Sequence, residues 1–279
     1  MRLSSIFYLS CTLKLEQDAL AYEIMKAAVS GVSKTQTIKH IKKTYNQSDE
    51  QIKQLLHLCN FKSKPKTTNY KTIAARPFTS AVKRLPFPFT QIYTIDTFLT
   101  PVECKDLINI SDKILRPSTV ADYGDTSAVT KYRTSKTADL HYFSSPFLNY
   151  VDNKIADLMG FYPFLGEILQ AQKYAPGQYY KEHCDYFCPL AKEFKTYTEW
   201  MGQRTWTVMV YLNDVEEGGG ETYFKHLKLK IKPTAGKAVI WNNLYSSGIP
   251  NPKTLHEALP PISGDKYVVT KWWRSWPLI

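Results

Sequence analysis

The sequence predicts an α+β protein with a mainly β core, a double-stranded β-helix (jelly roll) with supporting helices and an N-terminal helical module. After Gly160, short β-prone runs are separated by turns rich in Gly, Pro and Asn, and eight such runs match the strands of a jelly roll. Before Gly160, most apolar residues recur at helical spacing. The chain is therefore expected to divide into a helical module (1–60), a linker (61–88), a supporting region of the core domain (89–166) and the jelly roll itself (167–277).

Three short helices are predicted in the N-terminal module. Apolar residues at helical spacing run from about 13 to 30, and capping boxes at 33–36 and 48–51 open the second and third helices. The block up to Pro86 has 15 Lys and Arg against 5 Asp and Glu, whereas the rest of the chain has 21 against 20. Such a block could contact nucleic acid as a helix-turn-helix does, but solvated helix faces are the more ordinary explanation.

The linker is rich in Lys, Thr, Ser and Pro and lacks periodicity. In the supporting region, alternation at 91–98 predicts a strand, and a capping box with proline at 100–103 begins a helix that continues to Ile114. A further strand is expected at 131–135. A second helix is expected from 146 to 159, ended by Gly160.

The jelly-roll strands are placed by alternation between turn residues. They are expected at 168–174, 181–187, 205–212, 221–224, 227–231, 237–241, 255–259 and 266–273. The connections at 188–203 and 246–254 are long for hairpins, so they are candidate substrate-covering loops, with simple surface decoration as the alternative.

Composition favours a soluble, cytoplasmic protein with no membrane contact. No run of about 18 apolar residues suggests a membrane span. The first eleven residues are too short and too polar for a convincing signal peptide. The five cysteines are odd in number and scattered, which indicates unpaired thiols in a reducing compartment rather than a disulfide framework. Oligomeric state is not predictable from these features.

A metal site is indicated by His183 and Asp185. Successive side chains of a strand alternate faces, so these two, with one residue between them, project the same way from a predicted strand. With the distant His256 they would form a two-histidine, one-carboxylate facial triad, typical of non-haem Fe(II) oxygenases. Three coordination positions would stay open, enough for a chelating 2-oxo acid and O2. Lys266 lies ten residues after His256, and even spacing on regular strands would let both point into one cavity, where a buried cation would bind the far carboxylate.

The ordered series of motifs resembles the catalytic domain of the prolyl 4-hydroxylases, a family of Fe(II)- and 2-oxoglutarate-dependent dioxygenases. The resemblance covers about the last two-thirds of the chain. It is carried by 174–185 (YAPGQYYKEHCD), 211–214 (YLND), 218–222 (GGGET), 237–241 (KAVIW), His256 and 264–266 (GDK), and more loosely by 98–104 (FLTPVEC), 133–135 (RTS) and 158–160 (LMG).

The resemblance implies iron at His183, Asp185 and His256, and 2-oxoglutarate held by Lys266 with Tyr174 lining its pocket. Tyr211 is a weaker candidate for the same pocket. The implied reaction consumes 2-oxoglutarate and O2, yields succinate and CO2, is supported by L-ascorbate, and hydroxylates an unactivated C–H, most naturally C4 of a prolyl residue in a peptide or protein. Since Asp185 is present, the halogenating relatives, which need that ligand absent, are disfavoured.

Departures from the family pattern concern the pocket rather than the ligands. The chain has Glu-Ala-Leu-Pro at 257–260, where the family usually has small residues and Cys before Pro. It has Tyr267 where Trp is common in the family. A free amino acid or a non-prolyl residue is thus the alternative substrate within the class. Two alternatives lie outside the oxygenases. One is an inactive jelly-roll binding protein with a nucleic-acid-contacting module. The other is a zinc hydrolase that uses the same three ligands, which would leave Lys266 unexplained.

Overall fold

The computed structural model describes residues 33–45, 48, 52, 81–119, 132–161, 163–191, 194–198 and 201–275. The chain divides into two units. One comprises residues 1–71, 141–166 and 278–279, and the other comprises 72–140 and 167–277. None of the helices in the described ranges is long and apolar enough to cross a membrane.

The first unit contains the helices α2 (Lys34–Tyr45) and α6 (Pro146–Met159), with the short 3-10 turns η2 (Tyr142–Ser144) and η3 (Pro163–Leu165) on either side of α6. The predicted capping box of α2 is present, because the Gln36 amide donates to Ser33 Oγ at 3.3 Å and the Ser33 amide donates to Gln36 Oε1 at 3.2 Å. The helix predicted at 146–159 is confirmed. Gly160 ends it in the left-handed conformation, with φ 67°.

The first and third predicted N-terminal helices lie outside the described residues, apart from Ser48 and Ile52. The expected role of the module as a whole stays a prediction.

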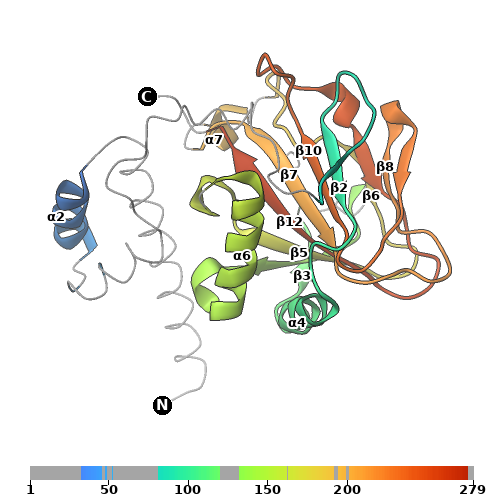
Figure 1. Ribbon diagram of the computed structural model, residues 1–279, viewed down its shortest axis with the longest axis horizontal. Coiled ribbons are helices and arrows are strands. Elements are labelled where there is room, and N and C mark those ends of the chain that lie inside the picture. The colour runs from blue at the N-terminus through green and yellow to red at the C-terminus, as the bar shows by residue number, and fades with distance from the viewer. Residues whose placement is uncertain are drawn as a thin grey trace. The chain divides into compact units, whose positions relative to one another are not determined.

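Two antiparallel sheets build the second unit (Figure 1). The larger sheet has eight strands in the spatial order β1 (Lys83–Arg84), β2 (Ile92–Ile95), β10 (Ala238–Asn242), β7 (Arg204–Tyr211), β12 (Lys266–Arg274), β5 (Leu169–Tyr174), β4 (Lys136–Leu140) and β3 (Arg116–Pro117). The smaller sheet has four strands in the order β6 (Tyr180–His183), β11 (His256–Ala258), β8 (Thr222–Phe224) and β9 (Leu229–Ile231). The mostly antiparallel core is that expected of a jelly roll, and all eight strands predicted after Gly160 are present.

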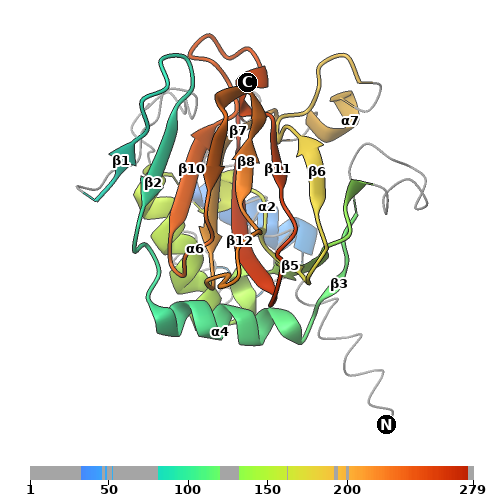
Figure 2. The same ribbon diagram turned by 90° about the vertical axis from the view of Figure 1, so that its right-hand side faces the viewer.

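The sheets are stacked face to face (Figure 2), and apolar residues from both form the core between them. Phe224 and Ile231 come from the smaller sheet, while Val239, Trp241 and Val268 come from the larger one. Because alternate residues of a strand point to opposite faces, each strand supplies this core with every second side chain. The core occupies the middle of the sandwich, and the cavity described below adjoins it.

Helix α4 (Pro101–Asp112) runs across one end of the strands (Figure 2). Thr100 and Glu103 form the predicted capping box, and the helix ends at Asp112, before the predicted Ile114. Gly236, with φ 77°, accepts hydrogen bonds from the amides of Phe98 and Leu99, and a Cβ there would lie 2.1 Å from Leu99 O. Glycine therefore allows the start of β10 to lie directly against the segment that leads into α4.

The strand predicted at 131–135 is wrong in position. The strand in this region is β4, which pairs with β5 from Lys136↔Lys173 to Leu140↔Leu169. Arg133 makes only an isolated bridge to Tyr180, and Ser135 is buried with its hydroxyl 2.9 Å from Ser118 Oγ. Side-chain hydrogen bonds therefore occupy the residues before β4. At the end of the predicted linker, Lys83 and Arg84 form β1 on the edge of the larger sheet.

Candidate active site

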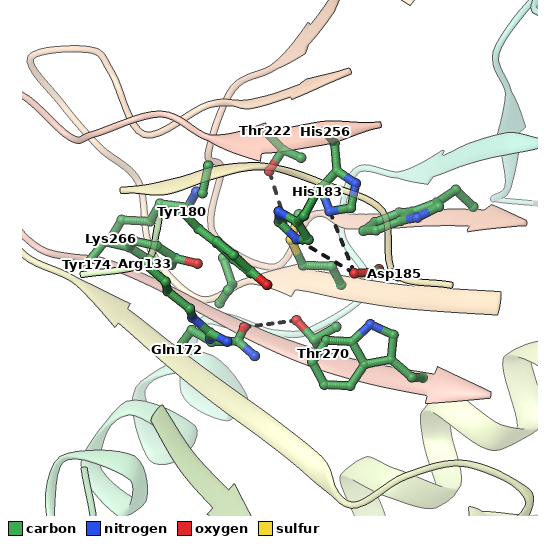
Figure 3. A pocket seen from close by; sticks show the side chains of 15 residues that line it. Arg133, Gln172, Tyr174, Tyr180, His183, Asp185, Thr222, His256, Lys266 and Thr270 are labelled. Atoms are coloured by element: carbon green, nitrogen blue, oxygen red, sulfur yellow. Dashed lines mark hydrogen bonds and ion pairs between the residues drawn. The ribbon is translucent and has the colours of Figure 1, made fainter. Parts of the chain in front are cut away.

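The two histidines of the predicted triad lie on neighbouring strands of the smaller sheet. His183 ends β6 and His256 begins β11, and they are direct partners in the antiparallel register. Their ring centroids are 4.3 Å apart. Asp185 Oδ1 lies 3.7 Å from His183 Nε2 and 3.9 Å from His256 Nε2. Together these three side chains present one ligand atom each within 4.8 Å of one another (Figure 3).

Asp185 does not lie on a strand, so the alternation argument for its orientation was wrong although its placement was right. β6 ends at His183, and Asp185 follows in a bend. The carboxylate is aimed instead by hydrogen bonding, because Thr207 Oγ1 on β7 donates to Asp185 Oδ2 at 2.6 Å. This bond leaves Oδ1 directed toward the two imidazoles.

Each imidazole is fixed by its second nitrogen. His183 Nδ1 lies 2.8 Å from the carbonyl oxygen of Lys181, and His256 Nδ1 lies 2.9 Å from that of Thr254. A carbonyl only accepts, so both Nδ1 atoms carry a proton, and Nε2 is the nitrogen of each ring that is left to bind a metal. Two imidazole nitrogens and one carboxylate oxygen in this arrangement suit an Fe(II) ion of the facial-triad type.

Electrostatics favour the metal-binding protonation states of His183 and Asp185. Burial and the neighbouring His256 lower the pKa of His183 to about 3, so its ring is neutral at pH 7. Burial would raise the pKa of Asp185, but the two imidazoles, the Arg204 guanidinium and the Thr207 hydroxyl hold it below its ordinary value. The site therefore presents an ionised carboxylate beside a neutral His183 ring.

Lys266 opens β12 and is 1% exposed, with Nζ 4.9 Å from the Tyr174 ring centroid and 5.6 Å from that of Tyr211. Burial lowers the pKa of Lys266 to about 7, opposed by the Glu221 carboxylate. Lys266 and His256 do line one cavity, but not by shared strand alternation, because β12 belongs to the larger sheet and β11 to the smaller one. The stacking of the two sheets brings them together (Figure 3).

Tyr174 and Tyr211, the two predicted pocket tyrosines, differ in their placement. Tyr174 pairs with Lys266 across β5 and β12 and lines the cavity. Tyr211 packs behind Lys266, and its hydroxyl donates to the carbonyl of Ile231 at 3.0 Å and lies 2.7 Å from Thr222 Oγ1. Tyr211 thus stabilises the wall of the cavity rather than forming its lining.

Several lining residues were not identified from the sequence as site residues. The cavity is also lined by Arg133, Gln172, Tyr180, Thr222, Trp241 and Thr270. Arg133 lies within the Arg-Thr-Ser motif of the resemblance, which was the available signal. Its guanidinium is 4.7 Å from the Tyr180 ring centroid, and the Tyr180 ring stacks on His183 at 3.6 Å. Thr207 carried no sequence signal, since a threonine on a buried strand is ordinary.

A wider groove of about 440 Å³ meets the cavity at His183 and Asp185. Arg133, Tyr180, His183, Asp185 and Trp272 line both spaces, and Cys188, at the start of the predicted covering loop 188–203, lines the groove. Cys184, Cys188 and Cys104 are free thiols, as predicted. The covering role of the loops 188–203 and 246–254 stays a prediction.

Comparisons with known proteins agree with this geometry. The family model of the 2OG-Fe(II) oxygenase superfamily matches residues 169–274. The chain is 34% identical over 201 residues to prolyl 4-hydroxylase 1 of Arabidopsis thaliana, covering 66% of this chain and 69% of that protein. It is 30% identical over 190 residues to a putative prolyl 4-hydroxylase of Acanthamoeba polyphaga mimivirus, covering 67% of this chain and 76% of that protein.

A solved structure is also similar. It is that of the viral collagen prolyl hydroxylase vCPH from Paramecium Bursaria Chlorella virus-1 in its 2OG complex, with a TM-score of 0.51 and 29% identity, covering 66% of this chain and 95% of that one. The residues matched by the family model include His183, Asp185, His256 and Lys266.

Proposed function

The chain belongs to the 2-oxoglutarate- and Fe(II)-dependent oxygenases of the prolyl 4-hydroxylase family, and we propose that it hydroxylates C4 of prolyl residues in a peptide or protein. The observation that carries this proposal is the joint placement of the triad and Lys266 in one cavity. Iron(II) held by the triad, with 2-oxoglutarate and O2, would supply the oxidising power to hydroxylate an unactivated C–H, giving succinate and CO2. Ascorbate would support turnover, as in many relatives.

His183, Asp185 and His256 would hold the metal through Nε2, Oδ1 and Nε2. The backbone carbonyls behind the two rings keep each Nδ1 protonated and so keep each Nε2 available. The Tyr180 ring stacked on His183 holds that ring in place and covers one side of it. All three ligands come from one end of the cavity, which leaves the opposite side for bound molecules.

Lys266 would bind the far carboxylate of 2-oxoglutarate. A buried ammonium is costly unless an anion neutralises it, and within the described residues no carboxylate forms an ion pair with Lys266. In Figure 3, Lys266 lies on one side of the pocket and the triad on the other. A molecule with a carboxylate at each end, one toward Lys266 and one toward the metal, satisfies both ends of the cavity.

The groove supports a peptide rather than a free amino acid as the substrate. At about 440 Å³ it is larger than the cavity of about 50 Å³, and its lining includes the aromatic residues Tyr132, Tyr180, Tyr186, Phe187 and Trp272. Aromatic-lined grooves suit extended, proline-containing chains, because the rings pack against the rigid pyrrolidine surface. Since the triad lies where the groove meets the cavity, a prolyl ring bound there would face the metal.

The test uses Fe(II) and 2-oxoglutarate added to the protein without O2, followed by Pro-containing peptides with O2. A metal-to-ligand charge-transfer band should appear first, and peptides should then gain the mass of one oxygen with one succinate formed for each. Asp185→Ala should lose both signals, while Asp214→Ala, which removes an exposed carboxylate from the loop after β7, should keep them. Full turnover in Asp185→Ala, or no band in the wild type, would overturn the proposal.

A further inference from the structure

A chain of buried hydrogen bonds leads away from the metal-binding carboxylate. Thr207 Oγ1 donates to Asp185 Oδ2 at 2.6 Å, and Asn243 Nδ2 donates to Thr207 Oγ1 at 2.9 Å. Thr207 and Asn243 are both 0% exposed, so water does not compete for these bonds. β10 ends at Asn242, and Asn243 follows it directly.

The direction of this chain decides what Asp185 can do. A threonine hydroxyl has a single proton, and the amide nitrogen of asparagine can only donate. Because Thr207 Oγ1 accepts from Asn243, its proton is left for Asp185 Oδ2. Oδ2 is thereby occupied, and Oδ1 is the oxygen that faces the Nε2 atoms of His183 and His256 at 3.7 Å and 3.9 Å.

Asn243 is also tied by its backbone to the loop that precedes the third ligand. The backbone N–H of Asn251 donates to the backbone carbonyl of Asn243 at 2.9 Å, and Thr254 Oγ1 donates to the backbone carbonyl of Asn251 at 2.7 Å. The Thr254 carbonyl in turn accepts from His256 Nδ1. Asn243 is thus connected by hydrogen bonds to both Asp185 and His256. Its side chain is connected to Asp185 through Thr207, and its backbone carbonyl is connected to His256 through Asn251 and Thr254.

We propose that Asn243 is a positioning residue for the metal site: by donating to Thr207 it commits the Thr207 proton to Asp185 Oδ2 and presents Oδ1 to the metal as a single ligand atom. This inference rests on the proposed metal site. Partners behind a metal ligand typically change metal affinity by about 10- to 100-fold when they are removed. Asn243 does not itself line the cavity, so its side chain would act on the site through Thr207.

Co(II) binding to the full chain, followed by titration calorimetry, tests the proposal without turnover. Asn243→Leu keeps the backbone bonds of residue 243 and removes the donor, and Thr207→Val removes the hydroxyl. Both should weaken Co(II) binding by roughly 10- to 100-fold. Thr207→Ser, which keeps the hydroxyl, should restore wild-type affinity.

The matched control is Asn242→Leu. Asn242 is equally buried and also uses its amide group, with Nδ2 donating to Gln91 Oε1 at 2.8 Å and Oδ1 accepting from the Leu244 amide at 3.0 Å, but it does not touch Thr207. Asn242→Leu should bind Co(II) like the wild type. A second readout is hydroxylation at saturating Fe(II), which should recover in Asn243→Leu because affinity, not fold, is lost.

The outcomes separate this inference from the proposed function. Wild-type Co(II) affinity in Asn243→Leu, or an equal loss in Asn242→Leu, overturns the role of Asn243 while leaving the metal site intact. Equal Co(II) binding by the wild type and Asp185→Ala would instead overturn the metal site itself. If Asn243→Leu does not fold, judged by thermal unfolding, the comparison of Thr207→Val with Thr207→Ser decides.

Discussion

Replacing Lys266 by methionine separates the cost of burying an ammonium group from its use as an anion-binding group. Lys266 is 1% exposed, and burial lowers its pKa from the ordinary 10.5 to about 7. At 1.36 kcal/mol for each pKa unit, a shift of this size corresponds to about 5 kcal/mol against the charged form, which is an upper limit for what the substitution can recover. Methionine keeps most of the length and packs against Tyr174. The ligand-free Lys266→Met protein should therefore be at least as stable as the wild type.

Bound 2-oxoglutarate should make the wild type more stable than Lys266→Met. A ligand at 100 times its dissociation constant stabilises the folded state by about 2.7 kcal/mol. In urea unfolding at pH 7 with Mn(II) present, 2-oxoglutarate should stabilise the wild type by about this amount and Lys266→Met hardly at all. Lys271→Met is the matched control, since Lys271 lies on the same strand, is 2% exposed and does not line the cavity. It should keep the 2-oxoglutarate effect.

Strong destabilisation of ligand-free Lys266→Met would contradict an unpaired Lys266, because the buried ammonium would then be satisfied within the protein. Equal stabilisation of Lys266→Met and the wild type by 2-oxoglutarate would contradict binding of the anion at Lys266. In that case the anion would bind elsewhere in the cavity.

Three further results are expected. The ligand-free wild type should gain stability between about pH 7 and 10.5, by up to about 1.4 kcal/mol per pH unit, because the unfolded chain binds a proton that folded Lys266 has released; Lys266→Met should lack this slope in urea unfolding. Glu167→Gln should lower the free energy of unfolding by about 2–4 kcal/mol, since Arg204 and Arg274 both bind this carboxylate at 2.6 Å, and a gain in stability would contradict this. Gln203→Leu should lower the free energy of unfolding by about 1–3 kcal/mol and weaken Co(II) binding. The side-chain amide of Gln203 bonds to both the N–H and the carbonyl of Phe187 at 2.7 Å, next to the bend that carries Asp185. Unchanged Co(II) affinity would show that these two bonds do not support the site.

Local patterns made much of the fold predictable. The eight strands after Gly160, the helix that Gly160 ends and the capping boxes at Ser33 and Thr100 depend on residues close together in the chain, and each is present. The misplaced strand at 131–135 shows the limit. Tyr132 and Thr134 are β-prone. Arg133 and Ser135, however, form side-chain hydrogen bonds with Thr137 and Ser118, which only the folded sheet brings within reach.

The candidate site was predictable as a set of residues but not as a geometry. His183, Asp185, His256 and Lys266 do come together, as their types and order indicated. The alternation arguments for Asp185 and Lys266 failed because β6 ends at His183 and because Lys266 lies on the other sheet. Thr207 was not predictable, since its role depends on a hydrogen bond across two strands rather than on its own neighbours in the sequence.

The distribution of the site over two sheets explains why its geometry depends on the core. His183 and His256 belong to the smaller sheet, whereas Lys266 belongs to the larger one. The distance between the proposed metal ligands and the proposed carboxylate anchor Lys266 is therefore set by the packing between the sheets. Phe224 of the smaller sheet packs edge-on against Trp241 of the larger one, with centroids 5.4 Å apart, and both rings also lie against His256. Because a packed core resists deformation, these two rings help to fix the span between the proposed metal ligands and Lys266, and therefore the length of a dicarboxylate that would bridge them.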